Sequence, residues 1–141
     1  MYTLLIVDDE EIEREGMAQF IPWDSYEIKV VSTARNGAEG LEKIAKFRPD
    51  LAIVDIKMPV MNGIEMIRQA KEQYPDMTFV VLSGYGDYEF TSQAMELGVR
   101  HYILKPCDES KMIPVLNKAI AEMEELSLIH ISEPTRHLRI S

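Results

Sequence analysis

The chain has 141 residues, a length that allows one ordinary domain and leaves little room for a second. Fifteen Lys and Arg residues stand against 24 Asp and Glu residues. The resulting net charge of −9 disfavours binding to nucleic acid or to an anionic membrane and is compatible with binding a cation. The single cysteine, Cys107, excludes an internal disulfide and a cysteine-based zinc site. The first residues resemble neither a signal peptide nor a membrane anchor, so we expect a cytoplasmic protein.

Short apolar runs alternate with segments of helical period along the chain. Five runs rich in Val, Ile and Leu are predicted as strands: Thr3–Val7, Ile28–Ser32, Leu51–Val54, Phe79–Leu82 and Tyr102–Leu104. Most of these runs are continuously apolar, which is typical of a parallel sheet covered by helices on both faces. Strands that alternate with helices in this way predict an α/β fold with a doubly wound, five-stranded parallel sheet.

Apolar stripes of helical period predict a helix after each strand. The first covers about Glu10 to Phe20, and Trp23 in the connection that follows is predicted to cap the sheet edge or join the core. Asn36 is the predicted N-cap of the second helix, and the third is predicted to start near Asn62. Gly98 is a natural stop for the fourth.

The last helix and the end of the chain are less regular. If Asp108 caps this helix, Pro114 removes an intrahelical hydrogen bond, so we expect a late start or a kinked first turn. After residue 126 the helical period is lost, and Pro134 would break a helix, while residues 128–131 have strand character. We therefore interpret residues 1–126 as the domain and residues 127–141 as a tail from vector or out-of-frame translation, with a native linker as the alternative.

Chemically active side chains follow the predicted strands. Asp8 and Asp9 follow the first strand and Asp55 the third, whereas Ser83 follows the fourth and Lys105 the fifth. In doubly wound sheets, ligands bind at the carboxyl ends of the strands. The sequence therefore predicts that three acids, one hydroxyl and one ammonium converge at a single edge.

The three acids predict a cation site at this edge. Carboxylates held close together repel one another, so either their pKa values rise or a cation joins them, and oxygen ligands favour a hard ion such as Mg²⁺. The alternative, that Asp8 and Asp9 only cap the first helix, needs one acid and not three. Lys105 is expected to pair with Asp55, and Lys105–Pro106 is a candidate cis peptide bond.

These residues, in their order and spacing, resemble the response-regulator receiver domain of bacterial two-component systems. The stretches that carry the resemblance are Asp8-Asp9, Asp55–Gly63, Leu82–Tyr85 and Tyr102–Pro106. The resemblance covers residues 2 to about 126 and implies a flavodoxin-like fold with strand order 2-1-3-4-5. The Ile-Pro-Trp connection at 21–23 further resembles receivers of regulators that carry an AraC-type DNA-binding domain.

By this resemblance Asp55 is the phosphoacceptor, and the phosphoryl donor is a sensor histidine kinase. The resemblance also implies that Asp9, Asp55 and the backbone carbonyl of Lys57 bind Mg²⁺ directly, with Asp8 assisting through water. Lys105 and the ion would neutralise charge in the transition state of phosphoryl transfer. The chain would then be a signalling switch that turns over no external substrate, and not an enzyme.

The resemblance also assigns Ser83 and Tyr102 as the switch pair. When the hydroxyl moves to the phosphoryl group, the aromatic ring follows into the vacated space. The face built from the fourth helix, fifth strand and fifth helix then changes its partners, which include a second copy of the chain. Lys57 and Tyr85 would crowd an attacking water, so we expect a phosphorylated form that survives well beyond seconds.

Two other classes of function stay open at this point. A degenerate receiver would act only as a protein-binding scaffold, although the acid pair, Asp55 and Lys105 are all present. A Mg²⁺-dependent phosphatase of the haloacid-dehalogenase type would need Asp-x-Asp after the first strand, whereas Asp8 and Asp9 are adjacent. Any DNA-binding output domain would lie in a part of the parent protein outside this chain.

Overall fold

The computed structural model describes the backbone of residues 1–136 and the side chains of residues 1–126. Its strands are β1 (Tyr2–Val7), β2 (Ile28–Ala34), β3 (Leu51–Asp55), β4 (Thr78–Ser83) and β5 (His101–Leu104). Its helices are α1 (Glu11–Phe20), α2 (Gly37–Phe47), α3 (Gly63–Gln73), α4 (Tyr88–Glu96) and α5 (Glu109–Arg136), with a 3-10 helix, η1, at Trp23–Tyr26. All five predicted strands are present, and each extends slightly beyond its predicted bounds.

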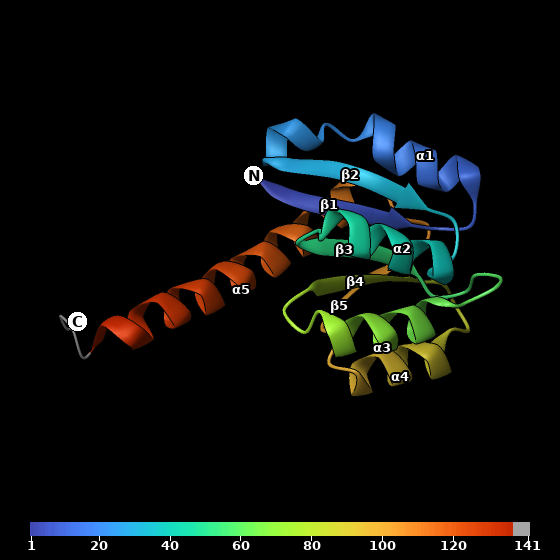
Figure 1. Ribbon diagram of the computed structural model, residues 1–141. Coiled ribbons are helices and arrows are strands. Elements are labelled where there is room, and N and C mark those ends of the chain that lie inside the picture. The colour runs from blue at the N-terminus through green and yellow to red at the C-terminus, as the bar shows by residue number, and fades with distance from the viewer. Residues whose placement is uncertain (137–141) are drawn as a thin grey trace.

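The five strands form one parallel sheet in the order β2-β1-β3-β4-β5. Helices α2, α3 and α4 cover one face of the sheet, and α1 and α5 cover the other (Figure 1). The predicted doubly wound α/β fold and its strand order are therefore confirmed. Because the strands are parallel, their carboxyl ends all lie at the same edge of the sheet.

The core consists of two apolar layers, one on each face of the sheet. Neighbouring residues of β1 contribute to opposite layers: Leu5 packs on the side of α2, α3 and α4, and Leu4 packs on the side of α1 and α5. Trp23 belongs to the second layer, where it is buried and its Nε1 donates to the carbonyl of Met17 at 2.9 Å. The predicted core role of Trp23 is confirmed, and its polar atom is paired, as a buried indole requires.

The helix ends follow the sequence signals. Asn36 caps α2 by accepting a hydrogen bond from the Glu39 N–H at 2.8 Å, and Asn62 caps α3 by accepting one from the Glu65 N–H at 2.9 Å. Gly98, just after α4, adopts a positive φ of 92°, which glycine tolerates without steric cost. These three predictions are confirmed, and Asn62 fixes where α3 leaves the loop that follows Asp55.

The start of α5 differs from the prediction. The helix begins at Glu109, and Asp108 caps it, since its carboxylate accepts from the Lys111 N–H at 3.1 Å. Pro114 is therefore a helical residue beyond the first turn. The expected late start is wrong, and the kinked first turn, the other expectation, stays a prediction. Because the cap fixes the first turn, the helix forms despite the one backbone hydrogen bond that the proline removes.

The end of α5 also differs. The backbone stays helical to Arg136, through Pro134 and residues 128–131, and this part extends away from the sheet (Figure 1). The predicted loss of helix after residue 126 and the strand character of 128–131 are wrong, because extending an existing helix avoids the cost of nucleation. Residues 137–141 of the predicted tail lie outside the described residues, and its origin stays a prediction. Within the described part of the chain, no helix is both long enough and apolar enough to cross a membrane.

Candidate functional site

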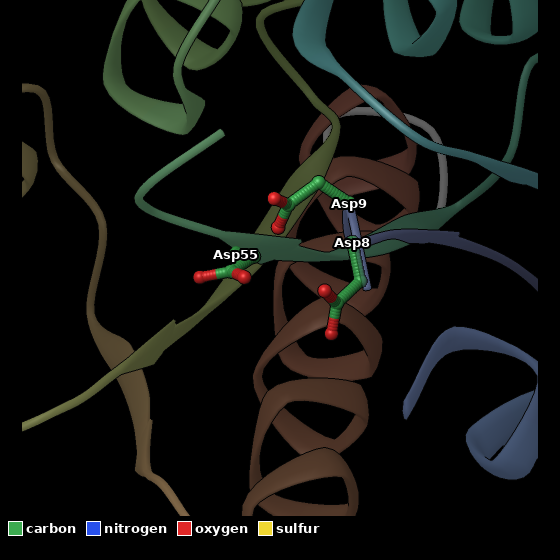
Figure 2. Close-up of side chains that lie close together, drawn as sticks. All are labelled: Asp8, Asp9 and Asp55. Atoms are coloured by element: carbon green, nitrogen blue, oxygen red, sulfur yellow. The ribbon is translucent and has the colours of Figure 1, made fainter. Parts of the chain in front are cut away.

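Three carboxylates meet at the carboxyl edge of the sheet. Asp8 and Asp9 follow β1, and Asp55 is the last residue of β3, directly beside it in the sheet. Each offers one oxygen, and these oxygens all lie within 4.8 Å of one another (Figure 2). Asp8 and Asp55 are buried, whereas Asp9 is exposed. The structure thus brings together the three acids to which the sequence pointed, with one side of the cluster open to solvent.

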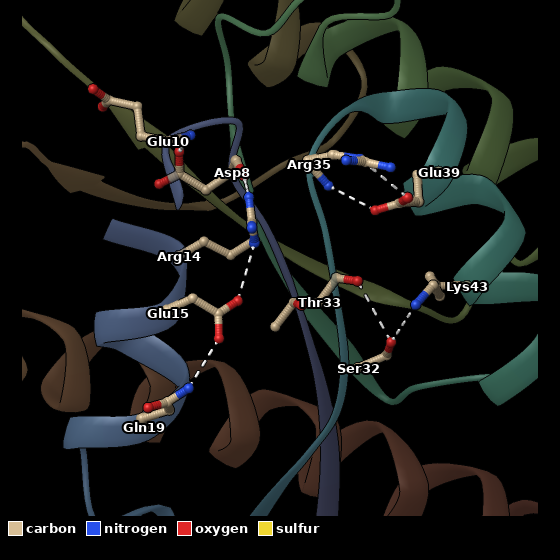
Figure 3. A network of polar contacts seen from close by, with 10 residues as sticks. All are labelled: Asp8, Glu10, Arg14, Glu15, Gln19, Ser32, Thr33, Arg35, Glu39 and Lys43. Atoms are coloured by element: carbon tan, nitrogen blue, oxygen red, sulfur yellow. Dashed lines mark hydrogen bonds and ion pairs between the residues drawn. The ribbon is translucent and has the colours of Figure 1, made fainter. Parts of the chain in front are cut away.

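Asp8 is fixed in place, but only one of its two carboxylate oxygens has a hydrogen-bond partner in the described part of the chain. Its Oδ1 accepts from the Glu10 N–H at 2.9 Å, and its backbone carbonyl accepts from Nη1 of Arg14 at 3.1 Å (Figure 3). Its Oδ2 is buried and has no hydrogen-bond partner among the described residues. Burial raises the pKa of Asp8 to about 7; the Glu10 N–H counteracts this rise, and the charge of Asp55 adds to it. A buried, unpartnered carboxylate oxygen beside two further acids fits a hard divalent cation.

Lys105 provides a cation to the same cluster. It follows β5, and its Nζ lies 2.8 Å from Oδ2 of Asp55 and 3.7 Å from Oε1 of Glu13. Burial raises the pKa of Asp55, and the hydrogen bond and charge of Lys105 counteract that rise. For Lys105 itself, burial lowers the pKa, but the Asp55 carboxylate outweighs burial and leaves the pKa above its usual value. The Lys105–Pro106 peptide bond is cis.

Ser83 and Tyr102 lie on the neighbouring strands β4 and β5. Ser83 is buried at the end of β4, and its backbone carbonyl accepts from the Lys105 N–H at 2.7 Å, which ties the two strand ends together. Tyr102 is half-buried, and its hydroxyl donates to the carbonyl of Val99 at 2.9 Å. Burial raises the pKa of this phenol. Their exchange of positions on phosphorylation stays a prediction.

Lys57, two residues after Asp55, pairs its side chain with the loop between β4 and α4. Its ammonium lies 3.0 Å from Oδ1 of Asp87, in the loop between β4 and α4. Tyr85, in the same loop, is 91% exposed. The proposed metal contact of Lys57 is through its backbone carbonyl, and that role stays a prediction.

Two contacts of the site were not predicted from the sequence. Glu13 reaches Lys105, and Asp87 binds Lys57. Glu13 belongs to the acidic first turn of α1, where negative charge stabilises the helix through its dipole. Asp87 stands at the N-cap position of α4, where an aspartate is common. Because both residues have a sufficient local explanation, the sequence gives no signal for their tertiary contacts.

Strand order and site together define a flavodoxin-like α/β domain with an acid cluster and a lysine at its carboxyl edge. The family model of the response regulator receiver domain matches residues 4–117. The chain belongs to this family, as the resemblance predicted. Receiver domains are in general signalling domains and not enzymes, and they bind Mg²⁺ at their acidic site.

Similar proteins include transcriptional regulators. The chain is 42% identical over 139 residues to the transcriptional regulatory protein YesN of Bacillus subtilis, covering 99% of this chain and 37% of that protein. It is 34% identical over 125 residues to the transcriptional regulatory protein HptR of Staphylococcus aureus, covering 89% of this chain and 49% of that protein. The chain thus spans half or less of the length of these relatives.

Solved structures of single receiver domains match over nearly their whole length. The receiver domain of the response regulator AraT from Geobacillus stearothermophilus superposes with a TM-score of 0.83 at 34% identity, covering 89% of this chain and 98% of that one. A receiver domain protein from Clostridium thermocellum superposes with a TM-score of 0.80 at 27% identity, covering 89% and 99%.

Proposed function

We propose that this domain accepts a phosphoryl group on Asp55 from the phosphohistidine of a sensor histidine kinase. The observation that carries the proposal is the position of Asp55. Its carboxylate is held at the end of β3, within hydrogen-bond reach of the Lys105 ammonium and next to two further acids. A nucleophile fixed beside a cation and a metal-ligand cluster suits phosphoryl transfer, in which catalysis is mainly positioning and charge neutralisation. We also propose a cytoplasmic location, because the domain has to meet the phosphohistidine of the sensor histidine kinase there.

The residues that would hold Mg²⁺ are Asp9, Asp55 and the backbone carbonyl of Lys57, with Asp8 assisting through water. The unpartnered Oδ2 of Asp8 and the close approach of the three carboxylates support this assignment. When bound, the ion neutralises negative charge on the phosphoryl oxygens and on the surrounding acids.

The protein's own groups act on the two ends of the transfer. A carboxylate oxygen of Asp55 attacks phosphorus, the new P–O bond forms as the P–N bond to the donor histidine breaks, and the bonding electron pair stays on the imidazole nitrogen. The Lys105 ammonium exchanges its partner from Asp55 to a phosphoryl oxygen, since the acyl phosphate carries more negative charge than the carboxylate. The Ser83 hydroxyl donates to a second phosphoryl oxygen.

The phosphorylated domain then presents a different face of α4, β5 and α5. Ser83 follows the phosphoryl group, and Tyr102 gives up its bond to Val99 and turns inward. Receivers often dimerise, and a second copy is the partner we propose for this face. The output that the switch controls is a DNA-binding domain outside this chain, which is consistent with relatives that are named transcriptional regulators and of which the aligned region covers only 37% and 49%.

The test is modification by acetyl phosphate, or binding of beryllofluoride, with and without Mg²⁺, in the wild type and in Asp55→Asn. We expect Mg²⁺-dependent modification in the wild type and none in the variant. Full modification of Asp55→Asn would overturn the assignment of the phosphoacceptor. A wild type that neither labels nor binds beryllofluoride would favour the degenerate scaffold instead. Membership of the receiver family speaks against the phosphatase alternative.

A further inference from the structure

Asp87 occupies the N-cap position of α4 but does not cap the helix. An aspartate at this position ordinarily accepts a hydrogen bond from a backbone N–H of the first helical turn. Here the carboxylate makes no such bond within α4, every residue of which the structure describes. The side chain is nevertheless buried, at 7% exposure, which is unusual for a carboxylate unless it is paired. The Asp87 carboxylate therefore needs partners outside α4.

Both oxygens of Asp87 turn back toward the phosphoacceptor edge. Oδ2 accepts from the Gly84 N–H at 2.7 Å, and Oδ1 lies 3.0 Å from the ammonium of Lys57. Burial alone would raise the pKa of Asp87, but the Gly84 N–H, Lys57 and, at longer range, Lys105 hold it below its usual value. Asp87 is thus an ionised group that lies within the electrostatic field of the same site.

The two donors that Asp87 binds belong to the segments that flank Asp55. Lys57 stands two residues after Asp55 along the chain, and Gly84 directly follows Ser83 at the end of β4. The Asp87 carboxylate therefore links the loop after β3 to the loop after β4. Lys57 also lies 5.9 Å from the ring centre of Phe90, so the link includes the first turn of α4.

We infer that Asp87 is a positioning residue that holds the loop between β4 and α4 in its resting arrangement by occupying the Gly84 N–H and the Lys57 ammonium. The inference rests on the proposed phosphorylation of Asp55. Phosphorylation converts the singly charged Asp55 carboxylate into an acyl phosphate with nearly two negative charges, and the added charge attracts these donors and repels the Asp87 carboxylate. Asp87 is then free to cap α4, so the start of that helix changes when the site is charged.

The first experiment compares Asp87→Asn with the wild type in a titration with beryllofluoride and Mg²⁺, followed through backbone amide resonances. Asparagine keeps an acceptor for Gly84 but loses the charge that holds Lys57. We expect Asp87→Asn to bind beryllofluoride roughly fivefold more tightly than the wild type. The substitution weakens the resting arrangement of the loop between β4 and α4, which competes with the arrangement of the beryllofluoride-bound protein. The matched control is Asp76→Asn, which removes one charge from an exposed residue before β4, at the opposite edge of the sheet, and should bind as the wild type does.

The second experiment uses Lys57→Gln. The fold tolerates this replacement, because the Lys57 side chain is 61% exposed. In the resting protein, the amides of residues 84–88 should shift toward their positions in beryllofluoride-bound wild type. In the Lys57→Gln background, Asp87→Asn should also increase the affinity for beryllofluoride by less than it does in the wild type, because both changes break the same ion pair.

The outcomes separate the inference from the proposed function. If the wild type binds beryllofluoride but Asp87→Asn binds equally well or more weakly, Asp87 does not hold the resting arrangement. Unchanged amides of residues 84–88 in Lys57→Gln would overturn the inference in the same way. If the wild type binds no beryllofluoride at all, the proposed function itself is wrong, and the inference falls with it.

Discussion

The ammonium of Lys105 lies 2.8 Å from Oδ2 of Asp55 and joins the end of β5 to the end of β3 across the intervening strand β4. Asp55 is 3% exposed, so its charge is largely removed from water. Such a charge is costly unless a partner of opposite sign is close. In the metal-free protein, Lys105 is that partner, and the same contact holds the ammonium where a phosphoryl group on Asp55 would need it.

Replacing Lys105 with methionine leaves Asp55 charged and unpaired. We expect Lys105→Met to lower the free energy of unfolding of the metal-free protein at pH 8 by about 2 kcal/mol, within the range for a buried charge that loses its partner. The measurement is urea unfolding in the presence of EDTA. Lys118→Met, which replaces an exposed lysine of α5, is the control and should change stability by less than about 0.5 kcal/mol. Equal stability of Lys105→Met and the wild type would show that Asp55 does not depend on this contact.

The buried carboxyl of Asp8 makes the metal-free domain less stable as pH rises. Its pKa is raised from 3.8 to about 7, so the folded protein binds this proton more tightly than the unfolded chain does. The resulting stabilisation is complete below pH 4 and is lost as pH rises toward and through 7. An asparagine side chain at this position has no proton to lose in this range. Metal-free Asp8→Asn should therefore be more stable than the wild type at pH 8, by about 1–3 kcal/mol, and similar to it at pH 4.

Thermal and urea unfolding at pH 4, 6 and 8 check this prediction, with Asp76→Asn as an exposed control. Mg²⁺ should stabilise the wild type at pH 8 and have a much smaller effect on Asp8→Asn, because the ion removes the same electrostatic penalty. A stability difference independent of pH would mean that Asp8 is ionised at all these values, and that its buried oxygen is not the source of the penalty.

Most of the fold and the acid cluster could be predicted because each depends on a local pattern. An apolar run such as Leu51–Val54 is long enough for a strand and too short for a helix, and it is followed at once by Asp55. Parallel strands place whatever follows them at one edge, so the convergence of Asp8, Asp55 and Lys105 follows from the strand assignments alone.

The contacts that could not be predicted are those between loops. The pairing of Asp87 with Lys57 depends on how two loops lie relative to each other, and an aspartate before a helix is already explained as a cap. Local rules also failed for α5, where Pro114 predicted a late start or a kinked first turn and Pro134 predicted a break in the helix. One lost hydrogen bond is a local cost, whereas a capped and growing helix is stabilised by many residues together.

Gly63 is the residue at which the site depends most directly on the absence of a side chain. Its N–H donates to the carbonyl of Ile56 at 2.8 Å, and a Cβ added to it would collide with the carbonyl oxygen of Asp55 and lie 3.0 Å from Cγ1 of Val54. Because the obstacle is strand backbone, it cannot move aside as a flexible side chain would. Gly63→Ala should therefore lower the free energy of unfolding by about 1–3 kcal/mol and displace Asp55, which would weaken its binding of beryllofluoride.

The matched control is Gly16→Ala in α1, where the nearest atom to an added Cβ is Cδ2 of Phe20 at 4.0 Å. This glycine is an ordinary helical residue, so alanine should stabilise the domain by about 0.5–1 kcal/mol and leave beryllofluoride binding unchanged. Urea unfolding and a beryllofluoride titration of both variants decide the matter. If Gly63→Ala were as stable and bound as tightly as Gly16→Ala, the loop after β3 would have room that the structure does not show, and the close approach of α3 to the Asp55 backbone would be irrelevant to the site.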